Sequence, residues 1–493
     1  MPDQVRHDTI RNKMELNLDS GANIYSRQKF IISLRIVFFL LLIAYSIYLL
    51  IKSPELALNL NPDTDTIVSF VSFRLIIGLY FFIAVFNLKK LKNSKLWLWI
   101  IVAVGLISRV ILIPSQPAIE DDYYRYLWDG AVTAHGYNPY VYSPEAAMNP
   151  ADKNVPGKIH QLAVESGDII KNINFPHVRT IYPVLSQLVF AIAYFIAPWQ
   201  FWAWKVLLLL FDFALLFVLL KTLREVKLPL LFVVFYWLNP IVIHEFYNAA
   251  HMDLLALLFV SLSLYLSFKN KTWFAVIALA LAAGFKLWPV VLLPLILRNL
   301  WRDKKQLVKY AGAFTGLVLV LFIPVLLSSL DMSLGFIRYA DKWVNNAAFY
   351  EIFTWLMQQA GSLIGMGANS LALLNRLGIL FVYLLLYIFI LRKSPINNLQ
   401  FFNKALLIVA VLYLISPTQF PWYYTWMVPL LVIRPKVSLL LYPFLLPLYQ
   451  LNYLADWIIY IEHIPILILF VLELKGVIWK DFYLVNSIQG NNQ

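Results

Sequence analysis

The segment Ile119-Glu120-Asp121-Asp122-Tyr123-Tyr124-Arg125-Tyr126-Leu127-Trp128-Asp129-Gly130 is acidic and aromatic, and it directly follows a long apolar run. A helix over this segment would carry four polar side chains on one face, at the spacing i, i+3, i+4 and i+7. These side chains belong to Asp122, Arg125, Tyr126 and Asp129. Two carboxylates, a guanidinium and a phenol on one face favour chemistry or ligand binding over packing in lipid. Gly136 is expected to end this helix.

The composition of the chain predicts its class. Of 493 residues, 61% are hydrophobic, 16% are aromatic and only 14% are charged, which is far outside the range of soluble domains. We therefore expect an all-α, polytopic transmembrane protein with about 11–14 crossings of roughly 20 residues each. The net charge of +13 is expected to reflect Lys and Arg on the cytoplasmic side of a membrane, so no nucleic-acid partner is expected. The absence of cysteine excludes disulfides and thiolate metal sites.

The sequence divides into a tail and a membrane domain. Residues 1–29 are polar and basic and have no apolar core, so we predict a cytoplasmic tail and not a signal peptide. Residues 30–493 are predicted to form a single transmembrane domain, because the apolar runs continue to the end without a soluble stretch.

Two long loops are predicted to lie on the outer side of the membrane. Positive charge favours the cytoplasmic side, and lysines fill the turn after the second apolar run, so the third run must emerge on the far side. These lysines are Lys89, Lys90, Lys92 and Lys95. The loop that follows, 115–180, is too long for a simple connector and is expected to be a folded cap that carries juxtamembrane helices. The second outer loop is predicted at 331–376.

Three later segments are expected to depart from simple spans. Segment 182–197 is expected to re-enter the membrane or lie in its interface, because a full crossing would place Lys221 on the wrong side. Segment 239–253 is expected to return to the outer surface and face the acidic segment. Segment 284–289 interrupts an apolar run and predicts a broken helix, which is tolerated only where it lines a cavity or the protein interior.

The acidic residues have three interpretations. Adjacent carboxylates suit a general base, for which Asp121 and Asp122 are the candidates. They also suit a hard divalent cation such as Mg²⁺ or Mn²⁺, with Glu120 and Asp122 as oxygen ligands. A solvated helix start is the third interpretation, because carboxylates stabilise the positive end of a helix.

Further candidate binding residues lie later in the chain. His251 and Asp253 lack the spacing of zinc ligands one turn apart, but they suit an acceptor hydroxyl or a cation, or simply a helix boundary. Lys286 stands in an apolar context where an ammonium is costly, so it is expected either to meet a lipid phosphate or to anchor at the interface. Trp422 and Tyr423 suit stacking on a sugar, or an aromatic anchor at the interface.

Five motifs follow one another along the chain: Asp122-Tyr-Tyr-Arg-Tyr-Leu-Trp-Asp-Gly130, Gly136-Tyr-Asn-Pro-Tyr140, Tyr182-Pro183, His251-Met-Asp253 and Ser416-Pro-Thr-Gln-Phe-Pro-Trp-Tyr-Tyr424. Taken in this order, they resemble the bacterial polyprenol-phosphate-sugar-dependent mannosyltransferases of the C superfamily of integral-membrane glycosyltransferases (GT-C). The resemblance covers most of the chain after the tail. In this superfamily the catalytic loop commonly follows the first helix, whereas here it follows the third. Two extra helices would therefore precede the shared core.

The resemblance implies a membrane enzyme of the cell envelope. It implies transfer of mannose or another hexose from a polyprenyl-phosphate donor to a hydroxyl of a lipid or glycan acceptor, at the outer face of the bacterial cytoplasmic membrane. Asp121 or Asp122 would be the catalytic base, and a single displacement would invert the anomeric centre. The residues expected to bind donor or acceptor are Arg125, Tyr126, Asp129, His251, Asp253, Lys286, Trp422 and Tyr423. Because a donor with one phosphate can react without a metal, the cation stays an open alternative.

A secondary transporter or lipid flippase is the alternative function. It would explain the many helices, the broken 284–289 segment and the position of Asp212 inside an apolar run. It explains poorly why the densest polar segment lies in an outer loop, and the two halves show no evident inverted repeat. A structural scaffold is a third alternative, and the intramembrane charges of Lys286 and Asp212 count against it.

Overall fold

The computed structural model describes residues 32–86, 94–363, 365 and 368–479. Within these ranges the regular structure is helical, and extended pairing is limited to the isolated bridges Arg179–Leu334 and Asn345–Thr418. The predicted all-α class is therefore confirmed. The predicted tail, 1–29, and Lys89, Lys90 and Lys92 lie outside the described residues.

Six described helices are each long and apolar enough to cross a membrane. They are Ile32–Leu56, α2 (Thr64–Phe86), α3 (Lys95–Leu112), α9 (Phe201–Glu225), Leu371–Leu391 within α19 (Ala368–Leu391), and α20 (Asn398–Ile415). The apolar pair Leu230–Trp237 and Pro240–Asn248 bends by 53° and adds a seventh crossing if it is counted as one span. The chain is thus a polytopic integral membrane protein.

The expected 11–14 crossings exceed this number, because several predicted spans are shorter or broken helices. The shorter apolar helices are α8 (Val184–Ile196), α12 (Asp253–Phe268), α13 (Thr272–Phe285) and the stretch Val437–Leu451, which comprises α23 (Val437–Leu445) and η9 (Leu446–Leu451). Helix α8 would be about 20 Å long, which is less than the roughly 30 Å of a hydrocarbon core. This agrees with the expectation that segment 182–197 does not cross fully. The remaining helices of the membrane domain include α15 (Lys304–Leu321), α22 (Val428–Ile433) and α24 (Ile458–Leu474).

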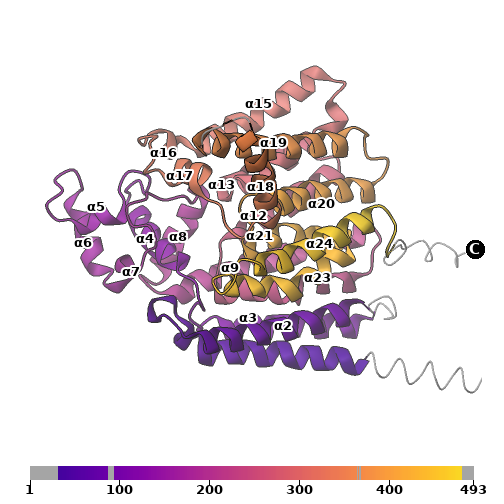
Figure 1. Ribbon diagram of the computed structural model, residues 1–493, viewed down its shortest axis with the longest axis horizontal. Helices are drawn as coiled ribbons and strands as arrows, with labels where there is room; N and C mark the ends of the chain where they lie inside the picture. Colours follow the sequence, from indigo (N-terminus) through magenta and orange to yellow (C-terminus); the bar gives the residue numbers. More distant parts are fainter. Residues whose placement is uncertain (1–31, 87–93, 364, 366–367, 480–493) are drawn as a thin grey trace, which may run out of the picture.

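A helical cap gathers at one end of the long helices, on the left in Figure 1. It contains α4 (Asp122–Ala134), α5 (Pro144–Met148), α6 (Gly157–Glu165) and α7 (Asp168–Lys171). The cap has its own hydrophobic core, in which Trp128, Ile159 and Leu162 are fully buried. Loop 115–180 is therefore a folded unit, as predicted, and not a simple connector.

A glycine sets the distance between α4 and α8. A Cβ atom on Gly130 would lie 2.6 Å from the carbonyl oxygen of Phe190, so a larger residue would force the helices apart. The ring of Tyr126 stacks on that of Phe190 with their centres 4.7 Å apart. Helix α4 ends at Ala134, and Gly136 follows with a φ of +78°, as expected for a helix C-terminus.

The second loop predicted to be outer, 331–376, contains α17 (Gly335–Lys342), α18 (Ala348–Leu363) and the start of α19, and it is hydrogen-bonded to the first such loop, 115–180. The backbone N–H of Arg179 donates to the carbonyl oxygen of Ser333 at 2.8 Å. The guanidinium of Arg179 also pairs with Asp331 at 3.0 Å and donates to the carbonyl oxygen of Tyr140 at 3.0 Å. The two outer loops are therefore joined to each other.

A buried ion pair links α3 to α9 inside the membrane domain. Arg109 pairs with Asp212 at 2.7 Å, and both side chains are fully buried. The carboxylate of Asp212 also accepts hydrogen bonds from the hydroxyls of Tyr236 and Tyr247. Asp212, the intramembrane acid of the sequence, is thus satisfied by partners within the protein, as a buried charge requires.

Helix ends that carry basic residues meet in pairs. Lys269, which follows α12, pairs with Glu225 at the end of α9 at 3.0 Å. The guanidinium of Arg298 donates to the carbonyl oxygen of Leu391, at the end of α19, at 3.1 Å. The end of α9 therefore lies beside the end of α12, and the Arg298 segment lies beside the end of α19.

Cysteines introduced into this cysteine-free chain should report the two sides of the membrane. Lys153→Cys in the cap and Met332→Cys in the second outer loop should react with a membrane-impermeant thiol reagent on intact cells, because both positions are exposed. Lys271→Cys and Lys393→Cys, exposed at basic helix ends, should react only after the membrane is opened. The reverse pattern of labelling would contradict the predicted orientation.

Candidate functional site

The backbone that leads into the acidic segment donates two hydrogen bonds to acceptors on separate helices. The N–H of Ile119 donates to the carbonyl oxygen of Leu56 at 2.8 Å, and the N–H of Ala118 donates to Oδ1 of Asn248 at 3.0 Å. Ile119 has a φ of +52°, a left-handed conformation that is rare for a β-branched residue. Such strain persists where the surroundings fix the backbone, and it clusters at functional sites.

Glu120 caps the start of α4. Its Oε1 accepts hydrogen bonds from the N–H groups of Asp121 at 3.0 Å and Asp122 at 2.9 Å, which stabilises a carboxylate at the positive end of the helix. Asn174, from the cap, donates from Nδ2 to Oδ1 of Asp121 at 2.7 Å and to Oδ1 of Asp122 at 3.3 Å. One amide therefore fixes both candidate bases side by side.

His251 reaches the acidic segment from the opposite side. It follows the π-helix η5 (His244–Asn248), and its N–H donates to the carbonyl oxygen of Glu245 at 2.8 Å. Its Nε2 lies 3.3 Å from Oε2 of Glu120 and 3.5 Å from Oε2 of Glu245. Its Nδ1 lies 4.0 Å from Oδ2 of Asp122. The predicted meeting of this region with the acidic segment is confirmed, and short π-helices are frequent at functional sites.

The acidic cluster is buried enough to change its protonation. Burial raises the pKa of Glu120, and burial together with the neighbouring carboxylates raises the pKa values of Asp121 and Asp122. Burial lowers the pKa of His251, although Glu245 and Asp122 act in the opposite direction. Adjacent carboxylates with raised pKa values bind a proton or a cation more readily, and perturbed pKa values of this kind are common at functional sites.

Three residues of the cluster are spaced to hold a metal ion. Glu120, Asp122 and His251 each offer one ligand atom, and these atoms lie within 4.8 Å of one another. Because Oε1 of Glu120 already accepts two backbone hydrogen bonds, Oε2 is the oxygen left for a ligand. Two carboxylate oxygens and one imidazole nitrogen fit Mn²⁺, and the oxygens alone fit Mg²⁺.

Lys286 forms a second polar group. Helix α13 ends at Phe285, and Lys286 is extended before the short helix η6 (Trp288–Leu292), so the predicted break is confirmed. The ammonium pairs with Oδ2 of Asp253 at 2.8 Å. The Asp253 side chain is 1% exposed and that of Lys286 is 20% exposed, so the ammonium keeps an accessible side.

Aromatic rings surround this ion pair. The ammonium of Lys286 lies 4.5 Å from the ring centre of Tyr423 and 5.7 Å from that of Trp426, within the range of cation–π attraction. The indole N–H of Trp426 donates to Oδ1 of Asp253 at 2.5 Å. The hydroxyl of Tyr423 is 2.9 Å from that of Tyr339, so α17 of the second outer loop also reaches this group.

The two polar groups are neighbours. Asp253, the partner of Lys286, is two residues from His251. Trp422, which stacks on His251, directly precedes Tyr423, whose ring contacts Lys286. The ring of Trp422 stacks on His251 with centres 3.9 Å apart and on Phe420 with centres 4.2 Å apart. Rings this close cover opposite faces of the indole, so Trp422 supports His251 and has only its edge left for a sugar.

The other predicted binding residues of α4 have partners in loop 115–180 and on α8. Arg125, Tyr126 and Asp129 are buried. Arg125 pairs with Asp129 at 3.2 Å and donates to the carbonyl oxygen of Val178. The amide of Gln187, on α8, donates to Asp129 at 3.3 Å. These side chains share one helix, as predicted, but in this arrangement they join α4 to its neighbours.

The structure also brings in residues to which the sequence analysis assigned no role. They are Arg74, Asn174, Glu245, Tyr339 and Trp426. Arg74 has a recognisable signal, because an arginine inside an apolar run is costly unless it has a partner. The loop residues Asn174 and Tyr339 have no comparable signal, because polar and aromatic residues are common in outer loops.

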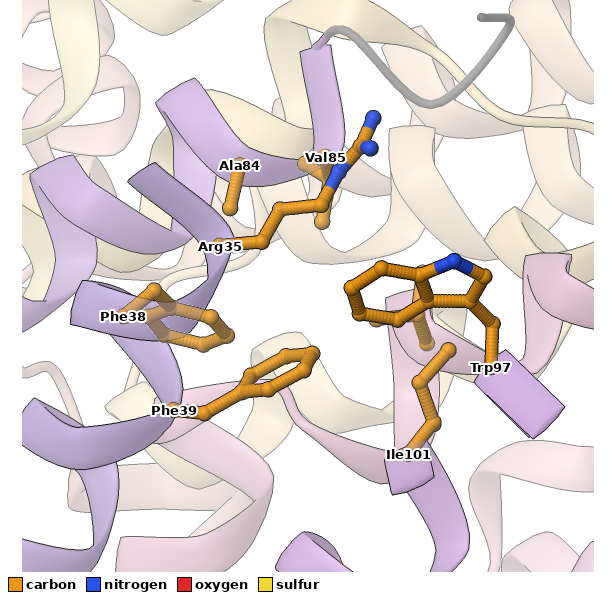
Figure 2. A pocket seen from close by; sticks show the side chains of 8 residues that line it. Arg35, Phe38, Phe39, Ala84, Val85, Trp97 and Ile101 are labelled. Carbon is orange, nitrogen blue, oxygen red and sulfur yellow. The ribbon is translucent and has the colours of Figure 1, made fainter. Parts of the chain in front are cut away.

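An apolar hollow is lined in part by side chains of the first helix, α2 and α3 (Figure 2). Its lining residues are Arg35, Phe38, Phe39, Ala84, Val85, Trp97, Ile101 and Val234. Trp97 is near the start of α3, whereas the acidic segment follows the end of that helix, roughly 20 Å away at 1.5 Å per residue. The hollow is therefore separate from the candidate site.

No protein-family model, curated protein or solved structure matches this chain. The GT-C resemblance of the sequence motifs thus stays a prediction, and the function must be argued from the geometry of the two polar groups.

Proposed function

We propose that the chain is a membrane glycosyltransferase that moves a sugar from a polyprenyl-phosphate donor to a hydroxyl of a lipid or glycan acceptor. The proposal rests on one observation. The carboxylates of Asp121 and Asp122, whose pKa values are raised, lie near the partly exposed ammonium of Lys286, which is surrounded by aromatic rings. The carboxylates suit a general base, and the ammonium suits a phosphate at the membrane surface. The sugar, mannose or another hexose, and the GT-C-like fold belong to the same proposal and rest on the sequence resemblance.

The proposed reaction is a single displacement. Asp121 or Asp122 takes the proton of the acceptor hydroxyl while the hydroxyl oxygen attacks the anomeric carbon. The bond between the anomeric carbon and the phosphate oxygen breaks, and its electron pair leaves with the lipid phosphate. Lys286 offsets the charge of that phosphate, and attack from the side opposite the leaving group inverts the anomeric centre.

The proposed location follows from the two outer loops. The donor lies in the bilayer, and its phosphate meets Lys286 where α13 breaks. The acceptor approaches from the outer side, beneath the cap that carries Asn174. The membrane is then the bacterial cytoplasmic membrane, with the site facing outward.

Purified protein incubated with an acceptor and a panel of polyprenyl-phosphate sugars should release the lipid phosphate from at least one donor. Asp121→Asn or Asp122→Asn should lower the turnover by about a hundredfold or more, because a general base is lost. The measurement is the rate of lipid-phosphate release by the wild type and each variant.

Asp168→Asn is the matched control, because Asp168 is a cap carboxylate whose side chain is 85% exposed. It should release lipid phosphate at the wild-type rate. Thermal unfolding of all variants near the wild-type midpoint shows that the loss is not one of folding. Release from no donor, or near-normal rates in both cluster variants, contradicts the proposal.

Lys286→Met should raise the donor concentration needed for half-maximal rate, because the charge that meets the phosphate is lost. It also leaves Asp253 buried without its cation, which costs about 3–5 kcal/mol of stability. The double variant Lys286→Met/Asp253→Asn removes both charges and should recover stability without recovering donor use. Lys286→Arg should keep part of the donor use. Wild-type donor dependence in the double variant would assign Lys286 a structural role alone.

We further propose that Glu120 and Asp122, with His251, hold Mg²⁺ or Mn²⁺, which leaves Asp121 as the base. The cation would supply a positive charge that orients the acceptor oxygen. A chelator should lower both the turnover and the thermal midpoint, and Mn²⁺ should restore both in the wild type but not in Glu120→Gln. A chelator that changes neither quantity would show that the cluster works with protons alone.

A further inference from the structure

The two N-terminal helices are the ones expected to precede the shared core of the GT-C resemblance, yet they contact the candidate site directly. The first, Ile32–Leu56, accepts a hydrogen bond at Ser53 Oγ from the N–H of Gln116 at 3.1 Å. Its last residue, Leu56, accepts the N–H of Ile119 at 2.8 Å. Both bonds fix the backbone that leads into the acidic segment.

The second helix, α2, brings Arg74 to the other side of the site. The guanidinium of Arg74 pairs with Oε1 of Glu245 at 3.1 Å, and the two side chains are 3% and 5% exposed. The second oxygen of Glu245, Oε2, lies 3.5 Å from Nε2 of His251. The carbonyl oxygen of Glu245 also accepts the N–H of His251 at 2.8 Å. Glu245 thus joins Arg74 to the histidine by its side chain and by its backbone.

Negatively charged side chains outnumber positively charged ones around His251. Glu120, Asp122 and Glu245 all place an oxygen within 4.0 Å of its ring nitrogens, and Asp121 is held beside Asp122 by one shared amide. Among the ion pairs of the described residues, Arg74 supplies the sole Arg or Lys bonded to any of these four carboxylates. A fixed positive charge has its largest effect where water is scarce, as it is here.

We propose that Arg74 is a positioning residue, which holds His251 against Glu120 through Glu245 and provides the fixed positive charge of the acidic cluster. The two extra helices are then part of the site and not added membrane anchors. The role of Arg74 in arranging the cluster is argued from the contacts above. Only the expected effect of Arg74 on turnover rests on the proposed function.

The pair Arg109–Asp212 offers an internal comparison. It also joins an arginine of one early helix to an acid of a later element, and it is fully buried. Its other side-chain partners are Tyr236, Tyr247 and the ring of Trp237, and none of the ion pairs or hydrogen bonds of the described residues joins it to the acidic cluster. Changes at Arg109 should therefore affect folding without any link to Glu120.

A double-mutant cycle on thermal unfolding tests the charge. Arg74→Gln should lower the unfolding midpoint, and adding Glu120→Gln should recover part of the loss, although Glu120 does not touch Arg74. Arg109→Gln should also lower the midpoint, and adding Glu120→Gln should recover none of that loss. Strictly additive effects in the Arg74 cycle would mean that Arg74 serves Glu245 alone, and the inference would be overturned.

A second set of variants tests whether Arg74 positions His251. This set remains informative even if Arg74→Gln does not fold. Arg74→Gln/Glu245→Gln removes both charges of the buried pair, so its midpoint should be close to that of the wild type. Its maximal rate should nevertheless fall about tenfold or more, with the dependence on donor concentration unchanged, because His251 has lost its support. Arg74→Lys should retain part of the rate. A folded double variant with the wild-type rate would overturn the inference.

The two proposals fail in different ways. Unfolding needs no substrate, so the cycle decides the role of Arg74 even if the wild type releases lipid phosphate from none of the donors. A wild type that releases no lipid phosphate would count against the glycosyltransferase proposal alone.

Discussion

The gathering of four carboxylates, one buried and three partly buried, at one point is the constraint on which the arrangement of this protein depends. A buried charge without partners is costly, so each carboxylate needs hydrogen bonds, a proton or a cation. Helix α4 supplies backbone N–H groups to Glu120, the cap supplies the amide of Asn174, and α2 supplies Arg74. Elements that are distant in sequence therefore converge here, because none of them alone can satisfy the cluster.

Local signals in the sequence were sufficient to predict the elements that carry the site. The spacing from Asp122 to Asp129 predicted one helical face, and segment 284–289 predicted a break, because both patterns depend on neighbouring residues only. The number of crossings was overestimated for a related reason. Helices α8 and α12 are as apolar as true spans, and composition cannot separate a short helix buried in protein from one surrounded by lipid.

Side-chain partners could not be predicted from the same signals. Lys286 was expected to face a lipid phosphate or to act as an anchor, and the structure gives it Asp253 as a partner 33 residues away. Arg74 and Glu245 are 171 residues apart, so their pairing depends on how α2 packs beside the π-helix. The cost of an arginine in an apolar run was nevertheless visible in the sequence. The reasoning applied to Asp212 would have identified Arg74 as well.

The distribution of satisfied and unsatisfied charge is what leads us to propose a transferase over a transporter. A transporter is expected to keep charged groups near the middle of the membrane, along the path of its substrate. Asp212, the acid that favours this alternative, is fully buried and bound by Arg109 and two tyrosines. Asp122, 24% exposed, and Lys286, 20% exposed, keep accessible surface and lie at helix ends. That placement suits transfer from a donor in the membrane to an acceptor outside it better than passage across the membrane.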